Sequence, residues 1–275
     1  MFFADTCWRR AYGSQSDDEG PPAKKQRTTD TQPHRSGSVN DGGHQFEMKM
    51  AAVIGLRGLQ RKETFELFSN RPDAGNFDDI VYTAVGRRFF LQLKHADSPD
   101  KKKLTEEDLV KLLRKCFESY CDIKHDVIFK DIPVSSSEFI IYTNKELEPT
   151  LLRHERKQRE LNIIFKTSEK GEIFSFLPDK NRQNDVYTLL GNEMRQSKKF
   201  RNLRNRESVS EFLNKLIIAT GQKGQWELDE VIEEEIRKHD AVRVDNELYK
   251  TELLEFKTRV EIWCRDKKEK MTNNV

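Results

Sequence analysis

The sequence contains no run of apolar residues approaching the roughly 18 that a membrane-spanning helix needs. Its four cysteines are scattered along 275 residues, too few for a disulfide framework and typical of a reducing compartment. The 49 basic and 47 acidic residues leave a net charge of only +2, so any basic surface must be local. These absences predict a soluble intracellular protein of the nucleus or cytoplasm, with no membrane partner.

Further absences exclude several kinds of site. Cys116 and Cys121 have no His or Cys pair at ligand spacing beside them, which argues against zinc. The sequence has no glycine-rich phosphate loop, no serine nucleophile constellation and no internal repeat. After the apolar start Met1-Phe2-Phe3, the residues Ala4-Asp5-Thr6 interrupt any signal-peptide core.

The first 42 residues differ in composition from the rest of the chain. From Ala11 to Gly42 the segment is rich in small and polar residues and almost lacks aliphatic ones, so burial cannot offset the entropy of ordering. We therefore predict a disordered tail over residues 1–42. Within it, Pro21-Pro22-Ala23-Lys24-Lys25-Gln26-Arg27 could be a nuclear-import signal or an ordinary charged cluster.

Ordered structure is predicted from residue 43 onward. Apolar residues at helical spacing indicate a helix that continues to about Leu59. Three strands are then predicted at Thr64–Phe68, Phe77–Ala84 and Arg88–His95. A capping box at Thr105-Glu106-Glu107-Asp108 opens a second helix, and the apolar run Glu138–Asn144 predicts a strand buried on both faces. The third strand, the second helix and this last strand would form a right-handed crossover.

The remainder of the chain has weaker patterns. Leu161–Lys166 and Glu172–Leu177 predict a hairpin, and residues beyond 178 are mainly helical, with one further strand within Phe212–Ala219. We therefore divide the ordered chain into a domain over residues 43–178 and a mainly helical extension over residues 179–275.

Acidic, amide and basic residues are expected to meet at one end of the predicted sheet. Gln92 and Lys94 lie two residues apart on the third strand, so they share a face and can approach Asp78 and Asp79 on the second. Because strand side chains alternate, we expect only one of the two aspartates to face Lys94. Glu47 shares a helix face with apolar residues, so it should be partly buried, where an isolated carboxylate is costly.

This order of elements, with Glu47, Asp78-Asp79 and Gln92-Leu93-Lys94, resembles the core of the restriction-endonuclease-like superfamily, the PD-(D/E)xK nucleases. The resemblance covers roughly residues 43 to 144. It implies an α/β fold with a helix, a three-stranded meander, a crossover helix and a fourth strand. Gln92 stands where the commonest pattern has Glu, a variant known among Mrr-like nucleases. The C-terminal pattern also looks similar to segments that follow such domains in larger multidomain proteins.

The resemblance implies a metal-dependent hydrolysis of phosphodiester bonds, in DNA rather than RNA. Asp79, Gln92 and Glu47 would hold Mg²⁺ or Mn²⁺ and its water, and Lys94 would assist the attacking water and stabilise the developing charge. Strands of the family commonly run from the aspartate into two apolar residues, here Ile80-Val81, which favours Asp79 over Asp78. Gln92 removes one negative charge, which predicts weaker metal binding.

Each of these residues also has an ordinary structural explanation. Lys94 could be a surface residue at a strand end, Glu47 could favour the helix dipole, and His95 could touch phosphate or simply end the strand. Gln92 and the balanced charge also fit a second hypothesis, a weak or inactive nuclease fold that serves as a nucleic-acid sensor or a protein-interaction scaffold. A third hypothesis is a pure protein-interaction domain.

Two charged segments lie in the predicted extension. Residues 195 to 206 contain six basic side chains and no acid, so they either bind nucleic-acid phosphates or form a solvated helix face. The candidate nucleic-acid contacts are Lys198, Lys199, Arg201, Arg204 and Arg206. The acidic helix expected at Leu228–Ile236 could dock a protein partner or pair with basic residues of this chain.

Overall fold

The structure is a computed structural model of the whole chain. It describes residues 41–99, 103–125, 129, 133–148, 156–159, 167–177, 185–196, 206–239, 251, 254–255, 258, 260, 262 and 271–273. The candidate nuclear-import segment and all but the last two residues of the predicted tail lie outside these ranges. Those two residues are helical, because the first described helix already begins at Asp41.

The described chain is a mixed α/β structure built on one eight-stranded sheet with the strand order β5-β6-β7-β4-β3-β2-β1-β8. In chain order the strands are β1 (Phe65–Ser69), β2 (Ile80–Ala84), β3 (Arg87–Lys94), β4 (Ser137–Thr143), β5 (Arg156–Gln158), β6 (Glu172–Phe176), β7 (Leu216–Thr220) and β8 (Met271–Asn273). The neighbours β3, β4 and β7 are parallel, and every other pairing is antiparallel.

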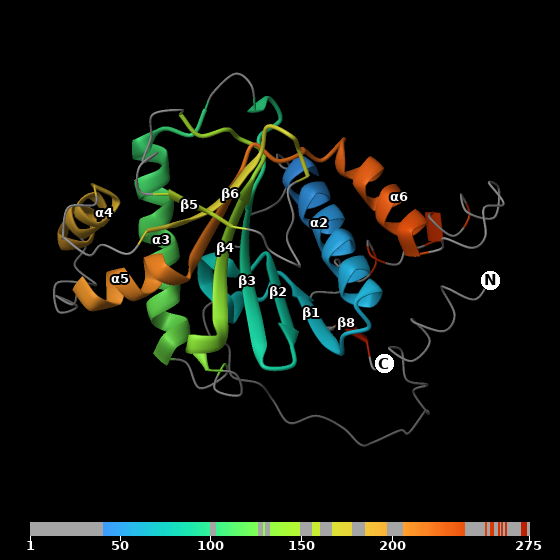
Figure 1. Ribbon diagram of the computed structural model, residues 1–275, viewed down its shortest axis with the longest axis horizontal. Helices are drawn as coiled ribbons and strands as arrows, with labels where there is room; N and C mark the ends of the chain where they lie inside the picture. Colours follow the sequence, from blue (N-terminus) through green and yellow to red (C-terminus); the bar gives the residue numbers. More distant parts are fainter. Residues whose placement is uncertain are drawn as a thin grey trace, which may run out of the picture.

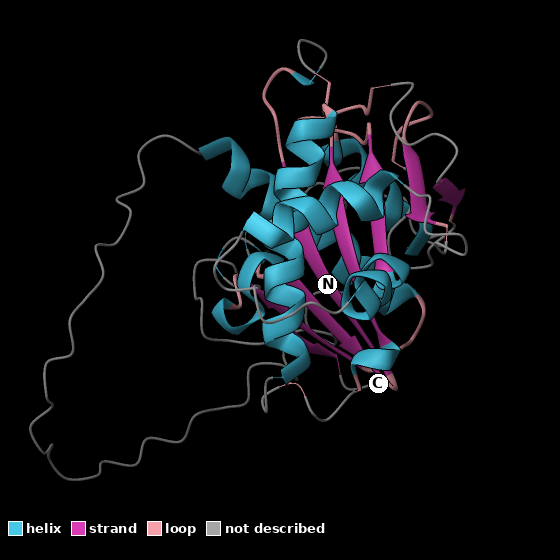
Figure 2. Cartoon of the chain, turned by 90° about the vertical axis from the view of Figure 1, so that its left-hand side faces the viewer, coloured by secondary structure: helices cyan, strands magenta, loops and turns pink. Residues whose placement is uncertain are grey.

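Helices cover both faces of the sheet (Figures 1 and 2). They are α2 (Asp41–Gln60), α3 (Glu106–His125), α4 (Asp185–Gln196), α5 (Arg206–Lys215) and α6 (Leu228–His239), with short 3-10 helices η1 (Pro72–Phe77) and η3 (Val134–Ser136). Figure 1 shows α2 and α6 on one side of the sheet and α3, α4 and α5 on the other. Within the described ranges, no helix combines the length and the apolar character needed to cross a membrane.

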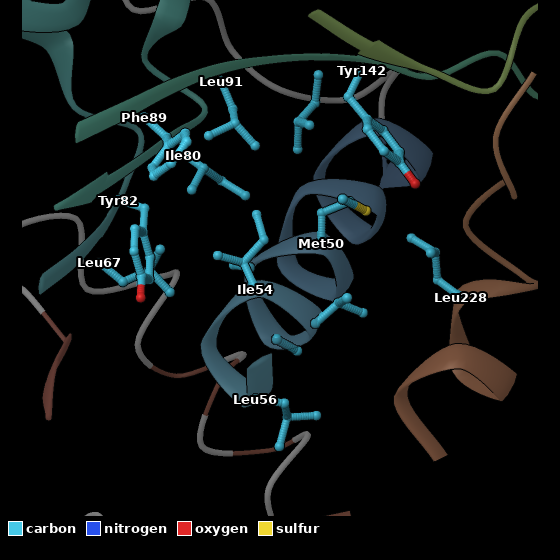
Figure 3. Packing of buried hydrophobic residues seen from close by; sticks show 14 of the residues in the cluster. Met50, Ile54, Leu56, Leu67, Ile80, Tyr82, Phe89, Leu91, Tyr142 and Leu228 are labelled. Carbon is cyan, nitrogen blue, oxygen red and sulfur yellow. The ribbon is translucent and has the colours of Figure 1, made fainter. Parts of the chain in front are cut away.

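The core on the α2 side joins α2 to the sheet and to α6. Met50 and Ile54 of α2 meet Ile80 and Leu91 of the central strands, and Leu228 of α6 approaches from the other side (Figure 3). A helix covered by a sheet and by a second helix is expected to be apolar around most of its circumference. That position explains the nearly continuous burial of α2 from Met48 to Leu56.

The core on the α3 side is rich in aromatic rings. Phe90 of β3 stacks on Phe139 of β4 with ring centroids 5.0 Å apart, and Tyr120 of α3 meets Phe139 edge-on at 5.1 Å. At the start of α3, the backbone N–H of Asp108 donates to Thr105 Oγ1 at 3.2 Å. The predicted helix start, the parallel strand β4 and its burial on both faces are confirmed.

The second strand begins later than predicted. Phe77 belongs to η1, and β2 starts at Ile80. The segment turns because Gly75 takes a left-handed φ of 62°, which suits a residue without Cβ. Asp78 ends η1 with an α-helical backbone, so the alternation of strand side chains does not extend to it.

The sheet also crosses the boundary predicted after residue 178. β7 lies between β4 and β6, and all five of its residues are buried. Phe212 is still in α5, so the late strand starts at Leu216. In the described chain, β6 pairs with β5 and β7, whereas the predicted strand at 161–166 lies outside the described residues.

Candidate active site

The candidate residues lie together at one end of the inner strands β2 and β3. β3 ends there at Lys94, and β2 begins there just after Asp79, because the two strands are antiparallel. The first turns of α2, which carry Glu47, lie near the same end of the strands (Figure 1). Carboxyl ends of parallel strands are the usual place for ligand sites in open α/β sheets.

Asp79 and Gln92 are in direct contact. Neighbouring Val81 and Phe90 belong to the α3-side core, so Asp79 and Gln92 point to that face. Asp79 Oδ2 accepts a hydrogen bond from Gln92 Nε2 and a second from the backbone N–H of Leu93 at 2.5 Å. The two residues are only 8% and 4% exposed. The carboxylate is therefore fixed by β3 and almost removed from solvent.

Backbone bonds around η1 hold the aspartates in place. The N–H groups of Asn70 and Arg71 donate to the carbonyls of Asp79 and Asp78 at 3.2 and 2.8 Å. The turn is tied to α3 as well, because Asn76 N–H donates to Ser119 Oγ at 2.7 Å. The position of Asp79 thus depends on β1, η1 and α3 together.

Glu47, Asp78, Asp79 and Lys94 form an electrostatic cluster at this end of the strands. Burial raises the pKa of Asp79 to about 7, with further increase from Glu47 and Asp78, whereas the Leu93 N–H and Lys94 oppose it. Burial also raises the pKa of Asp78, and Lys94 lowers it. The charge of Lys94 thus acts on both aspartates, and Asp79 is the one that bonds Gln92.

Glu47 belongs to the same cluster. Burial raises the pKa of Glu47 and Asp78 adds to the increase, whereas His44, the polar amide of Asn70 and the charge of Lys94 lower it. His44 Nδ1 lies 3.9 Å from Glu47 Oε2. Glu47 is half-buried, as its helix position predicted.

Lys94 is the exposed member of the group. It lies two residues after Gln92 on the same face of β3, at the strand end. Its charge lowers the pKa of all three acids, so it lies within electrostatic reach of each. Beneath it, the fully buried thiol of Cys116 in α3 has its pKa raised by burial to about 12 and stays neutral.

His95 is held away from this cluster. Its ring packs on Phe46 of α2 with centroids 5.0 Å apart, and its Nε2 accepts a hydrogen bond from the Gln225 N–H at 3.4 Å. The side chain is only 6% exposed, and burial lowers its pKa. The structure gives His95 a packing role between α2 and the loop before α6.

The structure describes the acidic segment fully but only the two ends of the basic segment. Lys198, Lys199, Arg201 and Arg204 lie outside the described residues, and Arg206 is the first residue of α5. The acidic helix is α6, and its apolar side packs on α2. Its Asp229 pairs with Lys49 at 2.8 Å and its Glu235 with Arg57 at 3.2 Å, so these two acids act within the protein.

Sequence reasoning missed Asn70, whose backbone N–H donates to the Asp79 carbonyl and whose side chain donates to Ser69 Oγ. Its only sequence signal is its place in a segment dense in turn-forming residues. Among the described residues, no three His, Cys, Asp or Glu side chains are grouped to hold a metal ion. Any cation would need the Gln92 carbonyl oxygen, water or substrate as further ligands.

Comparison with known proteins identifies no family for the chain. No protein-family model matches the chain, and no curated protein matches it. The chemistry of the residues must therefore carry any functional conclusion.

Proposed function

We propose that the protein is a metal-dependent nuclease with a restriction-endonuclease-like core, acting on DNA rather than RNA. The observation that carries the proposal is the contact between buried Asp79 and Gln92, with exposed Lys94 on the same face of β3. Isolated buried carboxylates are costly, and clustered titratable groups with shifted pKa values are typical of functional sites.

The donor set fits Mg²⁺ or Mn²⁺. Asp79 and Glu47 offer carboxylate oxygens, and Gln92 offers a carbonyl oxygen once its amide, which now directs Nε2 to Asp79, turns over. Burial raises the pKa of all three acids, and repulsion between them raises the pKa of Asp79 and Glu47 further, so a bound cation would offset that repulsion. When bound, such a cation lowers the pKa of its water and neutralises charge on the phosphate.

The remaining chemistry belongs to the protein side chains. Lys94 is free to reach a phosphate at the sheet edge because it is exposed, and its ammonium would orient the attacking water and stabilise the charge that develops. Glu47 would accept a hydrogen bond from that water on the α2 side. Asp79, fixed by Gln92 and Leu93, would keep the geometry constant through the reaction.

Plasmid nicking in Mg²⁺ or Mn²⁺ tests the proposal. Asp79→Asn and Lys94→Ala should each lower the nicking rate by about 100-fold or more. Lys103→Ala, which removes an exposed lysine near the same edge, should nick at the wild-type rate. Equal rates in all four proteins would refute the assignment of these residues.

A second candidate is a nuclease-fold module that binds nucleic acid or a protein without cutting. The observation in its favour is Gln92, which leaves the cluster with one carboxylate fewer than the commonest pattern of the superfamily. Calorimetry and the nicking assay separate the two functions. A module that only binds should show no Mg²⁺ or Mn²⁺ binding and no cleavage, but should still bind DNA or a protein.

A further inference from the structure

Arg71 lies in the turn between β1 and η1, beside the two aspartates. Its backbone N–H donates to the carbonyl of Asp78 at 2.8 Å, and the preceding N–H, of Asn70, donates to the carbonyl of Asp79 at 3.2 Å. These bonds extend the pairing of β1 with β2 past the last residue of β1. The backbone of Arg71 is therefore fixed to the segment that carries the candidate metal ligand Asp79.

The guanidinium of Arg71 packs on aromatic rings. Its Cζ lies 4.4 Å from the ring centroid of Phe68 and 4.8 Å from that of Phe129. Phe68 is the partner of Val81 in the β1–β2 ladder, and Val81 belongs to the α3-side core. Because Val81 follows Asp79 by two residues, the guanidinium lies over the same sheet face to which Asp79 points.

Hydrogen bonds hold one edge of this guanidinium and leave the other open. Arg71 Nε donates to both carboxylate oxygens of Asp73, at 2.9 and 3.1 Å. A guanidinium also carries N–H groups on Nη1 and Nη2. Within the part of the chain that the structure describes, neither Nη nitrogen has a hydrogen-bond partner, and neither is buried. The side chain is 20% exposed, so its open Nη edge reaches solvent.

An open, fixed guanidinium edge is suited to a phosphate group. Its parallel N–H groups match the oxygens of a phosphate, and a side chain that is already held in place loses little freedom when it binds. Other arginines of the described chain use their Nη groups within the protein. Arg57, Arg87 and Arg159 each direct an Nη nitrogen to a glutamate. Arg71 thus differs from them in having a donor edge available to a ligand.

We propose that Arg71 binds, through Nη1 and Nη2, a DNA phosphate other than the one that is cleaved. The proposal rests on the proposed function, in which Lys94 and the acidic cluster act on the scissile phosphate. Asp73 and the two aromatic rings hold the guanidinium in place before the DNA arrives. The contact would fix the DNA strand on the α3-side face, next to the aspartates, and so help to orient the reacting phosphate.

Fluorescence anisotropy of a labelled DNA duplex, measured with the full chain in EDTA at several salt concentrations, tests the proposal. EDTA removes the cations needed for cleavage, so the assay reports binding alone. Arg71→Gln should lower the affinity by about 10-fold and reduce the slope of log K against log salt by about 1, because one phosphate contact is lost.

Arg61→Gln is the matched control. Arg61 is also half-buried and paired with an acid, but it follows the end of α2 that lies away from Glu47. The control removes the same formal charge, so it should keep the wild-type affinity and the wild-type slope. Equal losses in Arg61→Gln and Arg71→Gln, or wild-type affinity and slope in Arg71→Gln, would overturn the role of Arg71.

Arg71→Lys separates the geometry of the contact from its charge, and it carries the test if Arg71→Gln does not fold. The lysine keeps the charge, so the salt slope should stay at the wild-type value, whereas the affinity should fall because an ammonium lacks the paired N–H groups. Wild-type affinity in Arg71→Lys, or no DNA binding by the wild type, would also overturn the role of Arg71. The expected binding changes without nicking in Mg²⁺ or Mn²⁺ would instead refute the proposed nuclease activity and support the Arg71 contact.

Discussion

The side-chain amide of Gln92 donates a hydrogen bond to Asp79 Oδ2, and both residues are buried. Gln92 therefore stabilises the aspartate across the two strands. A glutamate at this position would place a second carboxylate against the first, at a high electrostatic cost without a cation.

Gln92→Glu should consequently lower stability without metal and strengthen metal binding. We expect the melting temperature in EDTA to fall by about 5 °C or more and to recover in Mn²⁺, because a bound cation stabilises the folded state. Thermal melting with and without Mn²⁺ measures both effects. Gln222→Glu, at an equally buried glutamine beyond β7, should be destabilised without recovery in Mn²⁺. Recovery in both variants would contradict the prediction.

Asp79→Asn should stabilise the metal-free protein at high pH. The pKa of Asp79 is about 7 in the folded state and about 4 in an unfolded chain, so folding favours the protonated form. Stability from this group is therefore present below pH 4 and is lost as the pH rises toward 7. Urea unfolding at pH 5 and pH 8 should show the variant gaining about 2.5 kcal/mol relative to the wild type between these two pH values. A stability difference independent of pH would contradict this.

Gly75→Ala should destabilise the protein and impair the site. A Cβ at this position would lie 2.5 Å from Ser119 Oγ, and the backbone φ of 62° is strained for alanine. We expect a loss of about 3 kcal/mol in urea unfolding and a reduced nicking rate, because η1 leads directly into the aspartates. Gly86→Ala is the matched control, since its φ is also positive but its Cβ would meet open space. It should cost about 1 kcal/mol and leave nicking unchanged.

Glu235→Ala should loosen the packing of α6 on α2, the helix that carries Glu47. Glu235 is 2% exposed, and burial opposes its ionisation, but Arg57 and Lys238 keep its pKa below the usual value. Removing it leaves Arg57 without this partner in a partly buried position, at a cost of about 3 kcal/mol. Glu230→Ala, on the same helix but 77% exposed, should change the unfolding free energy by less than about 0.5 kcal/mol. Equal losses would contradict the role of the buried pair.

Patterns with a strong local cause were predictable from the sequence. Thr105 marked the start of α3, and the apolar run after Ser137 identified a strand covered on both faces. The start of β2 was not predictable, because Phe77 suits a strand as well as a 3-10 helix, and only the turn at Gly75 and its bonds to α3 decide between them.

Only part of the arrangement of the candidate residues could be predicted from the sequence. Spacing on β3 placed Gln92 and Lys94 on one face, yet the next residue, His95, differs in environment because Phe46 and Gln225 enclose it. Asn70 was missed because its place beside the aspartates depends on a backbone angle and on a hydrogen bond to the Asp79 carbonyl, neither of which composition reveals. β7 was only an ambiguous apolar run, because α5 leads into it at Lys215 without a turn.

The central position of β7 has a consequence for how the chain is made. A ribosome completes β3 and β4 long before residues 216–220 emerge, so the hydrogen-bonding edge of β4 stays open during synthesis. An open apolar strand edge invites pairing with other chains until its own partner arrives. A nascent chain that stops before Thr220 would therefore lack a central strand and leave the β4 edge without its partner.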